Sequence, residues 1–200
     1  MAPMKHTLAA AALLTALLLS PRLTAEHPAS AAVRAKTDTL LSTARWPRKA
    51  ARVDAVRALW RGWGDWEAIA AASVGPRVWG SLEEVHRTRL ASLLSDIAAL
   101  NWLRRVDSSP WVLTYLREET IGSRRVVVTQ LRTEGTSVDL RWTVEKRGED
   151  WHLVDLVTEG ASLVETQRTS FARVLDKGGV NRLFLRLERK REDLLAEVAR

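Results

Sequence analysis

The sequence of 200 residues contains no cysteine, which excludes disulfide bonds, thiolate metal sites, cysteine nucleophiles and the lipid attachment site of bacterial lipoproteins. Histidine is scarce as well, and His27, His86 and His152 lack the short spacing of a metal-binding motif. The sequence shows neither a nucleotide-binding loop nor a nucleophile elbow. We therefore expect no metal and no cofactor, and a binding protein is favoured over an enzyme.

Aromatic residues other than tryptophan are rare. The chain has one tyrosine and two phenylalanines, against nine tryptophans, which is an unusual number for this length. We expect most tryptophans to belong to a hydrophobic core, because a large indole ring contributes more to packing than to a specific contact. Trp46, Trp60, Trp63 and Trp66 are expected to pack helices or to lie half exposed, and Trp142 is expected in a pocket wall.

The only long hydrophobic run lies at the start of the chain. Lys5 and His6 precede an apolar stretch of 13 residues, 7–19, and Pro21 follows it. This order is typical of a secretory signal peptide, which we assign to residues 1–25. An uncleaved membrane anchor is the alternative, but 13 residues are few against the roughly 20 that span a bilayer. The sequence thus predicts an exported protein whose mature chain, 26–200, is one domain.

Two places fit the cleavage of this signal peptide. Cleavage after Ala25 is preferred because the site Leu23-Thr24-Ala25 follows the apolar run closely. The segment Ala29-Ser30-Ala31 fits the small-residue rule better but lies farther from the run.

The charge of the chain is moderately basic. Lysine and arginine number 31 against 24 acidic residues, giving a net charge of +7, and removal of Lys5 and Arg22 with the signal leaves 7 − 2 = +5. For an exported protein this balance favours anionic lipid or an acidic docking surface over nucleic acid as the partner. A solvated arginine-rich surface without a partner explains the charge equally well.

Helical periodicity characterises the first half of the mature chain. Val53, Val56 and Trp60 indicate a helix that Gly62 and Gly64 stop. Before it, residues 26 to about 50 are expected to hold a short helix and a connector, and the connector ends at Pro47. The helix with Val53 should run to about residue 60. A further helix, capped by Asp65, should end near Trp79. A longest helix then follows to about Arg104, opened by a Ser81/Glu84 capping box and bearing the stripe Leu82, Val85, Leu90, Leu93, Leu94 and Ile97.

The next part of the chain changes to a period of two. Four runs rich in valine, threonine, leucine and tryptophan are separated by Gly122, Gly135 and Gly148, which favours an antiparallel meander. The predicted strands are 111–120, 124–132, 138–146 and 151–158. The third alternates cleanly, with Val138, Leu140, Trp142 and Val144 facing inward. In the fourth we expect Trp151, Leu153, Asp155 and Val157 on one face and Val154 and Leu156 on the other.

A turn and two helices follow the fourth strand. Ser162 and Glu165 form a second capping box directly after Gly160, for which we expect a positive φ. Gly178 and Gly179 are expected to end that helix, and Val180 begins another apolar stripe. Leu194, Leu195 and Val198 continue the stripe, so the tail after Leu187 is interpreted as a helix that could serve in docking. Helices, then strands, then helices predict an α+β fold.

One family carries these residues in this order. The pattern resembles the MlaC family, also called toluene-tolerance auxiliary proteins, over Trp151-x-Leu153-x-Asp155-Leu156, Glu159-Gly160-x-Ser162-Leu163-Val164, Arg168, Phe171, Leu175 and Gly178-Gly179-Val180. The likeness continues more weakly back to about Asp65. Two features depart from the family: Gln167 stands where an aromatic residue is frequent, and the long helix passes early into a strand.

The resemblance implies a fold and a function. The fold would be a curved four-stranded antiparallel sheet wrapped by helices, similar to the nuclear-transport-factor-like cone, with an apolar lipid cavity. The function would be that of a periplasmic phospholipid-binding component of an ABC transport system, linked to outer-membrane lipid asymmetry. Its partners would be phospholipid, an inner-membrane ABC transporter complex and an outer-membrane lipid complex, with the chain acting as a monomer and binding no nucleic acid.

Candidate site residues follow from this expectation. The cavity wall is expected to contain apolar residues of the sheet and helices: Ile97, Val126, Val128, Leu140, Trp142, Val144, Leu156, Leu163 and Phe171. Arg104, Arg105, Arg124 and Arg125 are candidates for contact with lipid phosphate or an acidic partner, or are simply solvated. The alternative function is a small-molecule enzyme on the same cone, using Asp155 and Tyr115, although no catalytic residue is assigned.

Overall fold

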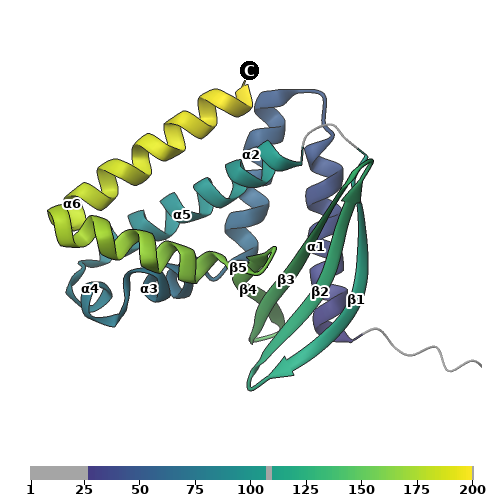
Figure 1. Ribbon diagram of the computed structural model, residues 1–200, viewed down its shortest axis with the longest axis horizontal. Helices are drawn as coiled ribbons and strands as arrows, with labels where there is room; N and C mark the ends of the chain where they lie inside the picture. The colour runs from purple at the N-terminus through teal and green to yellow at the C-terminus, as the bar shows by residue number, and fades with distance from the viewer. Residues whose placement is uncertain (1–26, 107–109, 200) are drawn as a thin grey trace, which may run out of the picture.

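The computed structural model describes residues 27–106 and 110–199 (Figure 1). It contains six helices and a five-stranded antiparallel sheet in these residues, which confirms the predicted α+β class. The predicted signal peptide, 1–25, lies outside the described residues. Among the described helices, none combines the length and the apolar character that crossing a membrane requires.

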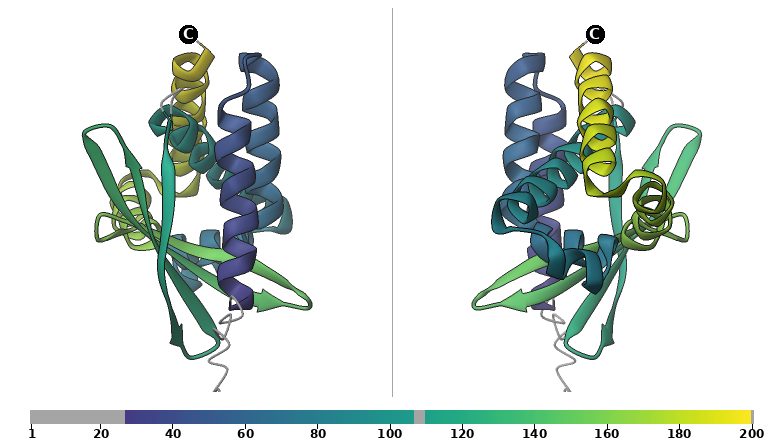
Figure 2. Two further views of the ribbon diagram at one scale, coloured as in Figure 1. Left: turned by 90° about the vertical axis from the view of Figure 1, so that its right-hand side faces the viewer. Right: turned by 90° about the vertical axis from the view of Figure 1, so that its left-hand side faces the viewer.

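Two helices, α1 (Pro28–Ala44) and α2 (Lys49–Trp63), open the fold. Figures 1 and 2 show them side by side, with α1 running along the sheet. The prediction that Gly62 stops the second helix is wrong, because α2 continues through Gly62 to Trp63. The buried rings of Trp60 and Trp63 hold this last turn in place, and their packing outweighs the poor helix propensity of one glycine. The helix ends at Gly64.

The helix predicted from Asp65 to Trp79 is broken in two. Its first part, α3 (Trp66–Val74), is capped as expected, since the Asp65 carboxylate accepts a hydrogen bond from the Ala68 amide at 3.0 Å. Gly75 then takes φ +83° and ψ 159°, and Pro76 starts α4 (Pro76–Ser81) in a new direction. Proline disfavours a helical conformation at the residue before it, which explains the break.

The longest uninterrupted helix is α5 (Glu84–Arg105). The predicted capping box at its start is wrong: Glu83 is the N-cap residue without a side-chain cap, and Ser81 instead donates to the Val78 carbonyl at 2.8 Å. Val85, placed in the apolar stripe by the prediction, is 64% exposed. The remaining stripe residues, from Leu90 onward, are buried in the core as predicted.

The sheet is a meander of β1 (Val112–Ile121), β2 (Arg124–Thr133), β3 (Thr136–Arg147), β4 (Asp150–Thr158) and β5 (Ala161–Ser162). Its strand order follows the sequence, and every pair is antiparallel, as predicted. The count is five instead of four because two residues after the turn at Gly160 pair back onto the end of β4.

A one-residue bulge in β4 overturns the predicted alternation of that strand. Thr143 pairs with Asp155 and Val144 pairs with Leu153, so Val154 is the extra residue. Leu153 and Leu156 consequently share the face of their partners Val144 and Trp142, which point toward the helices. Asp155 lies on the opposite face, although the sequence placed it beside Leu153.

The last helix, α6 (Leu163–Ala199), has two arms. Gly178 and Gly179 have non-helical backbone angles, so that a first arm, 163–177, and a second arm, 180–199, meet at a bend, as the glycine pair predicted. In Figure 1 the arms diverge from this bend and α5 runs between them. Leu183, Leu187 and Leu194 of the second arm are buried, so the tail is part of the fold.

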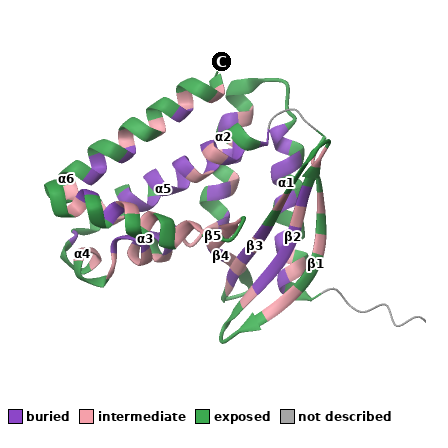
Figure 3. Cartoon of the chain, viewed as in Figure 1, coloured by how far each residue is buried: buried purple, intermediate pink, exposed green. Residues whose placement is uncertain are grey.

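Buried residues lie along α2, α5 and the sheet (Figure 3), and tryptophan rings form the centre of this core. Trp63 stacks on Trp142 with ring centroids 5.3 Å apart, and Trp60 lies 6.0 Å from both Trp63 and Trp102. Trp60, Trp63 and Trp66 are buried, whereas Trp46 is half exposed, which agrees with the expectation for these four. The core therefore joins α2 to α5 and β3.

A buried carboxylate links α2 to α5. Asp96 is 2% exposed and accepts hydrogen bonds from Arg57 at both of its oxygens and from Arg61 at one. The hydrogen bond to Asp96 raises the pKa of Arg57 above its usual value, against the opposing effect of burial. This group is a structural ion cluster and lies among residues that do not line the site described next.

Candidate functional site

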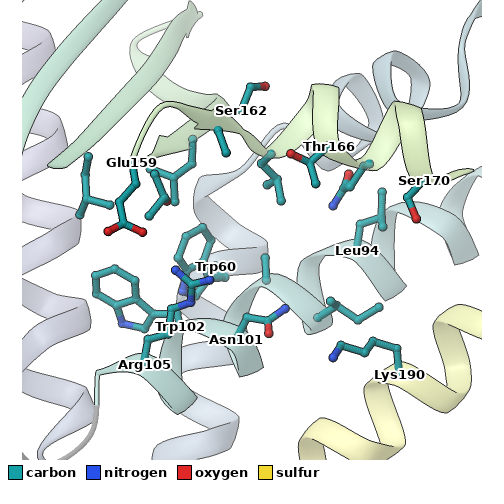
Figure 4. A pocket seen from close by; sticks show the side chains of 18 of the residues that line it. Trp60, Leu94, Asn101, Trp102, Arg105, Glu159, Ser162, Thr166, Ser170 and Lys190 are labelled. Atoms are coloured by element: carbon teal, nitrogen blue, oxygen red, sulfur yellow. The ribbon is translucent and has the colours of Figure 1, made fainter. Parts of the chain in front are cut away.

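A cavity of about 760 Å³ lies between the start of β3, the end of β4, α5 and both arms of α6 (Figure 4). This volume lies within the range of about 300–1,000 Å³ that is usual for ligand sites in proteins. The elements around it come from both halves of the chain, so the cavity exists only in the folded molecule.

Each helix presents one face to the cavity. On α5 the lining residues are Leu94, Ile97, Ala98, Asn101, Trp102 and Arg105, which recur every three or four positions. The first arm of α6 follows the same spacing with Leu163, Thr166, Gln167, Ser170 and Phe171. The second arm adds Leu183, Arg186, Leu187 and Lys190. Three helical faces of this kind converge because the bend at Gly178 and Gly179 folds the second arm back toward α5.

The deeper wall is apolar. The sheet contributes Leu131, Val138, Leu140 and Leu156, and the rings of Trp60 and Trp102 close the side next to the core. Because the side chains of this wall are almost entirely hydrocarbon, its suitable occupant is a hydrocarbon group and not a polar metabolite.

The rim of the cavity is polar and mostly basic. Arg105, Arg186 and Lys190 are exposed, and Glu159 is the one acidic residue among those that line the cavity. Glu159 has a φ of +52°, an uncommon angle for a residue with a side chain, and it forms a tight turn with Gly160, whose φ is +83°. The strained turn places a carboxylate at the sheet side of the cavity, as Figure 4 shows.

Two side chains of the first arm fix α6 against α3. The Ser73 hydroxyl donates to the Gln167 side-chain oxygen at 2.7 Å, and the Arg168 guanidinium donates to the Ala72 carbonyl at 2.9 Å. Gln167 also lines the cavity, so one polar side chain both forms the wall and holds it to the neighbouring helix.

Comparison with known proteins agrees with this architecture. The family model described as MlaC protein matches residues 34–189. The chain belongs to the MlaC family. A solved structure of similar fold is a phospholipid-binding protein from Ralstonia solanacearum in complex with a phospholipid; it is 21% identical with a TM-score of 0.74, and the match covers 84% of this chain and 98% of that one. No curated protein sequence matches the chain.

For this MlaC family member, five of the nine predicted site residues line the cavity. These are Ile97, Leu140, Leu156, Leu163 and Phe171. Trp142 and Val144 do not line it, because they lie farther along β3, where Trp63 covers the ring of Trp142. They belong to the solid core beside the cavity.

Val126 and Val128 do not line the cavity either. They pair with Thr143 and Arg141, on the face of β3 that points away from the helices, whereas Val127 pairs with the inward Trp142. Both valines are nevertheless buried, and the residues paired beside them on that outer face, Arg117, Arg141 and Glu119, form ion pairs. The hydrogen bond from Arg117 contributes most to lowering the pKa of Glu119, and Arg141 adds to the effect.

Of the four candidate arginines, only Arg105 lines the cavity. Arg104 forms an ion pair with Glu197 at 3.7 Å, Arg124 with Glu145 at 3.9 Å and Arg125 with Glu118 at 3.7 Å. These three serve contacts within the fold.

The two residues of the enzyme alternative occupy structural positions. Asp155 accepts hydrogen bonds from the Leu156 amide, the Val164 amide and the Ser162 hydroxyl. The Tyr115 hydroxyl contacts the Thr37 hydroxyl, and Arg34 lies over the Tyr115 ring. Neither Asp155 nor Tyr115 lines the cavity, so the fold does not bring them together there. Across the described ranges, no group of three or more His, Cys, Asp or Glu side chains is placed to hold a metal ion.

The rim residues Arg186, Lys190 and Glu159 were not predicted from the sequence. A signal for part of the rim was present, because Thr166, Gln167 and Ser170 interrupt the apolar stripe of the first arm at helical spacing. Polar residues within such a stripe indicate a helix face that meets a ligand or water instead of a close-packed core. Arg186 and Lys190 carried no comparable signal, because Arg186 lies alone between Leu185 and Leu187 and Lys190 lies within the charged run 188–193.

Proposed function

We propose that the protein is a periplasmic phospholipid carrier, which accepts lipid from one membrane complex and delivers it to another as part of an ABC transport system. The observation that supports this proposal best is the cavity itself, with an apolar wall for acyl chains and a polar, basic rim for a headgroup. Membership of the MlaC family and the phospholipid bound by the Ralstonia protein point the same way.

The energetics of such a cavity suit a carrier. Burying about 30 methylene groups from water is favourable by about 24 kcal/mol, at about 0.8 kcal/mol for each group. A bilayer offers nearly the same gain, so exchange between the cavity and a membrane is close to balanced. The direction of transport would then come from the partners, which we propose to be an outer-membrane lipid complex and an inner-membrane ABC transporter.

Lipid bound to the native protein provides the test. The mature protein, purified without detergent, should release phospholipid on solvent extraction, and mass spectrometry would identify it. Depleted protein should also take lipid from vesicles. A folded wild-type protein that carries no lipid by either route would refute the carrier function.

Adjacent residues of β4 supply a matched pair of variants. Leu156 lines the cavity and Val157 points to the other face, although both are half buried. We expect Leu156→Asp to reduce bound lipid by at least about tenfold, because a carboxylate would face hydrocarbon. Val157→Asp introduces the same charge on the same strand and should retain lipid. Circular dichroism of both variants separates loss of lipid from loss of fold.

A further inference from the structure

Three basic side chains at the cavity rim have no acidic partner among the residues that the structure describes. They are Arg105 at the end of α5 and Arg186 and Lys190 on the second arm of α6. Two other arginines that contact α6 are paired with acidic residues, Arg104 with Glu197 and Arg89 with Glu188. The rim therefore keeps positive charge that the fold itself does not use.

The spacing of these cations is unfavourable for the protein alone. Arg186 and Lys190 are four positions apart on one helix, where like charges repel by a few tenths of a kcal/mol. Arg105 approaches the same cavity from α5, and Figure 4 shows Asn101 between Arg105 and Lys190. An arrangement of this kind becomes favourable when an anion lies between the cations.

The rim also contains one opposing charge. Glu159 lies on the sheet side of the cavity, in the turn between β4 and β5. Three cations and one carboxylate give 3 − 1 = +2 for the residues that line the cavity.

We propose that Arg105, Arg186 and Lys190 bind the headgroup phosphate of the lipid and make the carrier prefer phospholipids of net negative charge over zwitterionic ones. The inference rests on the proposed function. A zwitterionic headgroup adds an ammonium group that the basic rim repels, whereas an anionic headgroup adds none. Arg186 lies within the matched family region and Lys190 lies just beyond it, so the set extends past the part of the chain that defines the family.

A competition within one membrane tests this preference. Depleted protein is equilibrated with vesicles that contain equal amounts of phosphatidylglycerol and phosphatidylcholine with identical acyl chains, and the lipid bound to the re-isolated protein is quantified by mass spectrometry. Both lipids share one surface potential in these vesicles, so the ratio reports the cavity and not attraction to the membrane. We expect phosphatidylglycerol to be enriched about two- to fivefold, the effect that exposed charge pairs have on an equilibrium.

Charge-removing variants assign the preference to the rim. The double variant Arg186→Gln/Lys190→Gln should bring the ratio of phosphatidylglycerol to phosphatidylcholine close to one, and Arg105→Gln should lower it. Glu159→Gln should raise it. Arg189→Gln removes the same charge from an exposed residue of the same arm that does not line the cavity, and should leave the ratio at the wild-type value.

The outcomes separate the two proposals. The inference would be overturned if the protein bound phosphatidylglycerol and phosphatidylcholine in equal amounts. It would also be overturned if the double variant kept the wild-type ratio of the two lipids. Either result would leave the carrier function intact. Absence of bound lipid of either kind would overturn both. Inorganic phosphate, compared with sodium chloride at equal ionic strength, tests whether the rim is instead a site for free phosphate, because salt alone screens exposed charges. We expect phosphate to leave the ratio at its value in sodium chloride, and loss of the preference in phosphate alone would overturn the inference.

Discussion

Removal of the Asp155 carboxylate should destabilise the protein more than any other single change in the turn before α6. Asp155 Oδ1 accepts hydrogen bonds from the amides of Leu156 at 2.9 Å and Val164 at 3.2 Å, and Oδ2 accepts one from the Ser162 hydroxyl at 2.7 Å. The Ser162 oxygen in turn accepts a hydrogen bond from the Glu165 amide at 3.1 Å. One carboxylate thus connects β4, β5 and the first turn of α6.

The magnitude follows from these contacts. A hydrogen bond to a charged group contributes about 1.5–3 kcal/mol when buried, but Asp155 is only half buried and water can replace part of each bond. We therefore expect Asp155→Ala to lower the free energy of unfolding by about 2–4 kcal/mol. Ser162→Ala removes one helix cap and should cost about 1 kcal/mol. Asp155→Asn keeps an acceptor for both amides, so its effect should be the smaller of the two changes at this position.

Denaturant unfolding of the two single variants and the double variant measures these effects. The midpoints should shift while the slopes stay constant, since the surface exposed on unfolding is the same. Asp155→Ala and Ser162→Ala remove the same hydrogen bond between these two residues. The sum of their separate losses of unfolding free energy should therefore exceed the loss in the double variant by about 1 kcal/mol. Strict additivity, or an Asp155→Ala variant within about 0.5 kcal/mol of wild type, would refute this account of the turn.

Two other predictions concern glycine and the start of the mature chain. Gly160→Val should cost more than about 1 kcal/mol of stability, because the backbone φ of Gly160 is +83°. Gly62→Ala should instead stabilise the protein by about 0.5–1 kcal/mol, because Gly62 lies inside α2 and no atom lies within 4 Å of an added Cβ. Equal shifts of the melting temperature in the two variants would contradict this. Amino-terminal sequencing of protein released by osmotic shock should begin at Glu26, because the cleavage site after Ala25 follows the apolar run closely. This start also retains Ser30, which donates two hydrogen bonds to Glu118 in the folded protein. An intact Met1 in the membrane fraction would refute export by a cleaved signal.

The order of elements was predictable because local signals agreed with the fold. Runs rich in valine, threonine, leucine and tryptophan indicated four strands, and the glycines between them take the positive φ angles that tight turns require, +59° at Gly122, +74° at Gly135 and +60° at Gly148. The glycine pair at 178–179 likewise marked the bend of α6. These features depend only on neighbouring residues, so periodicity and turn chemistry suffice.

The errors arose where long-range pairing decides the outcome. Three valines in a row, 126–128, give no alternation, and only their register with β3 determines that Val127 faces inward. The bulge at Val154 reverses the facing of every later residue in β4, although one inserted residue leaves no mark in the composition. The rim escaped prediction for the same reason: the angle at which the second arm returns to α5 is a property of the packed structure.

Two identical motifs with different outcomes illustrate the role of context. Ser81 and Ser162 are each followed three residues later by glutamate. Ser162 begins a helix because Asp155 holds its hydroxyl in place and leaves its oxygen free for the Glu165 amide. Ser81 comes at the end of α4, where its hydroxyl donates to a carbonyl of that helix and takes no part in the start of the next one.

The cavity between the two arms of α6 has a thermodynamic consequence for a carrier. A ligand that binds only the folded state stabilises it in proportion to the logarithm of its concentration relative to the dissociation constant. Cargo that contacts both arms would therefore raise the melting temperature, and each delivery would return the protein to a less stable form. For such a carrier the melting curve would report occupancy directly, and a receiving partner would have to supply the free energy that the fold loses when its cargo leaves.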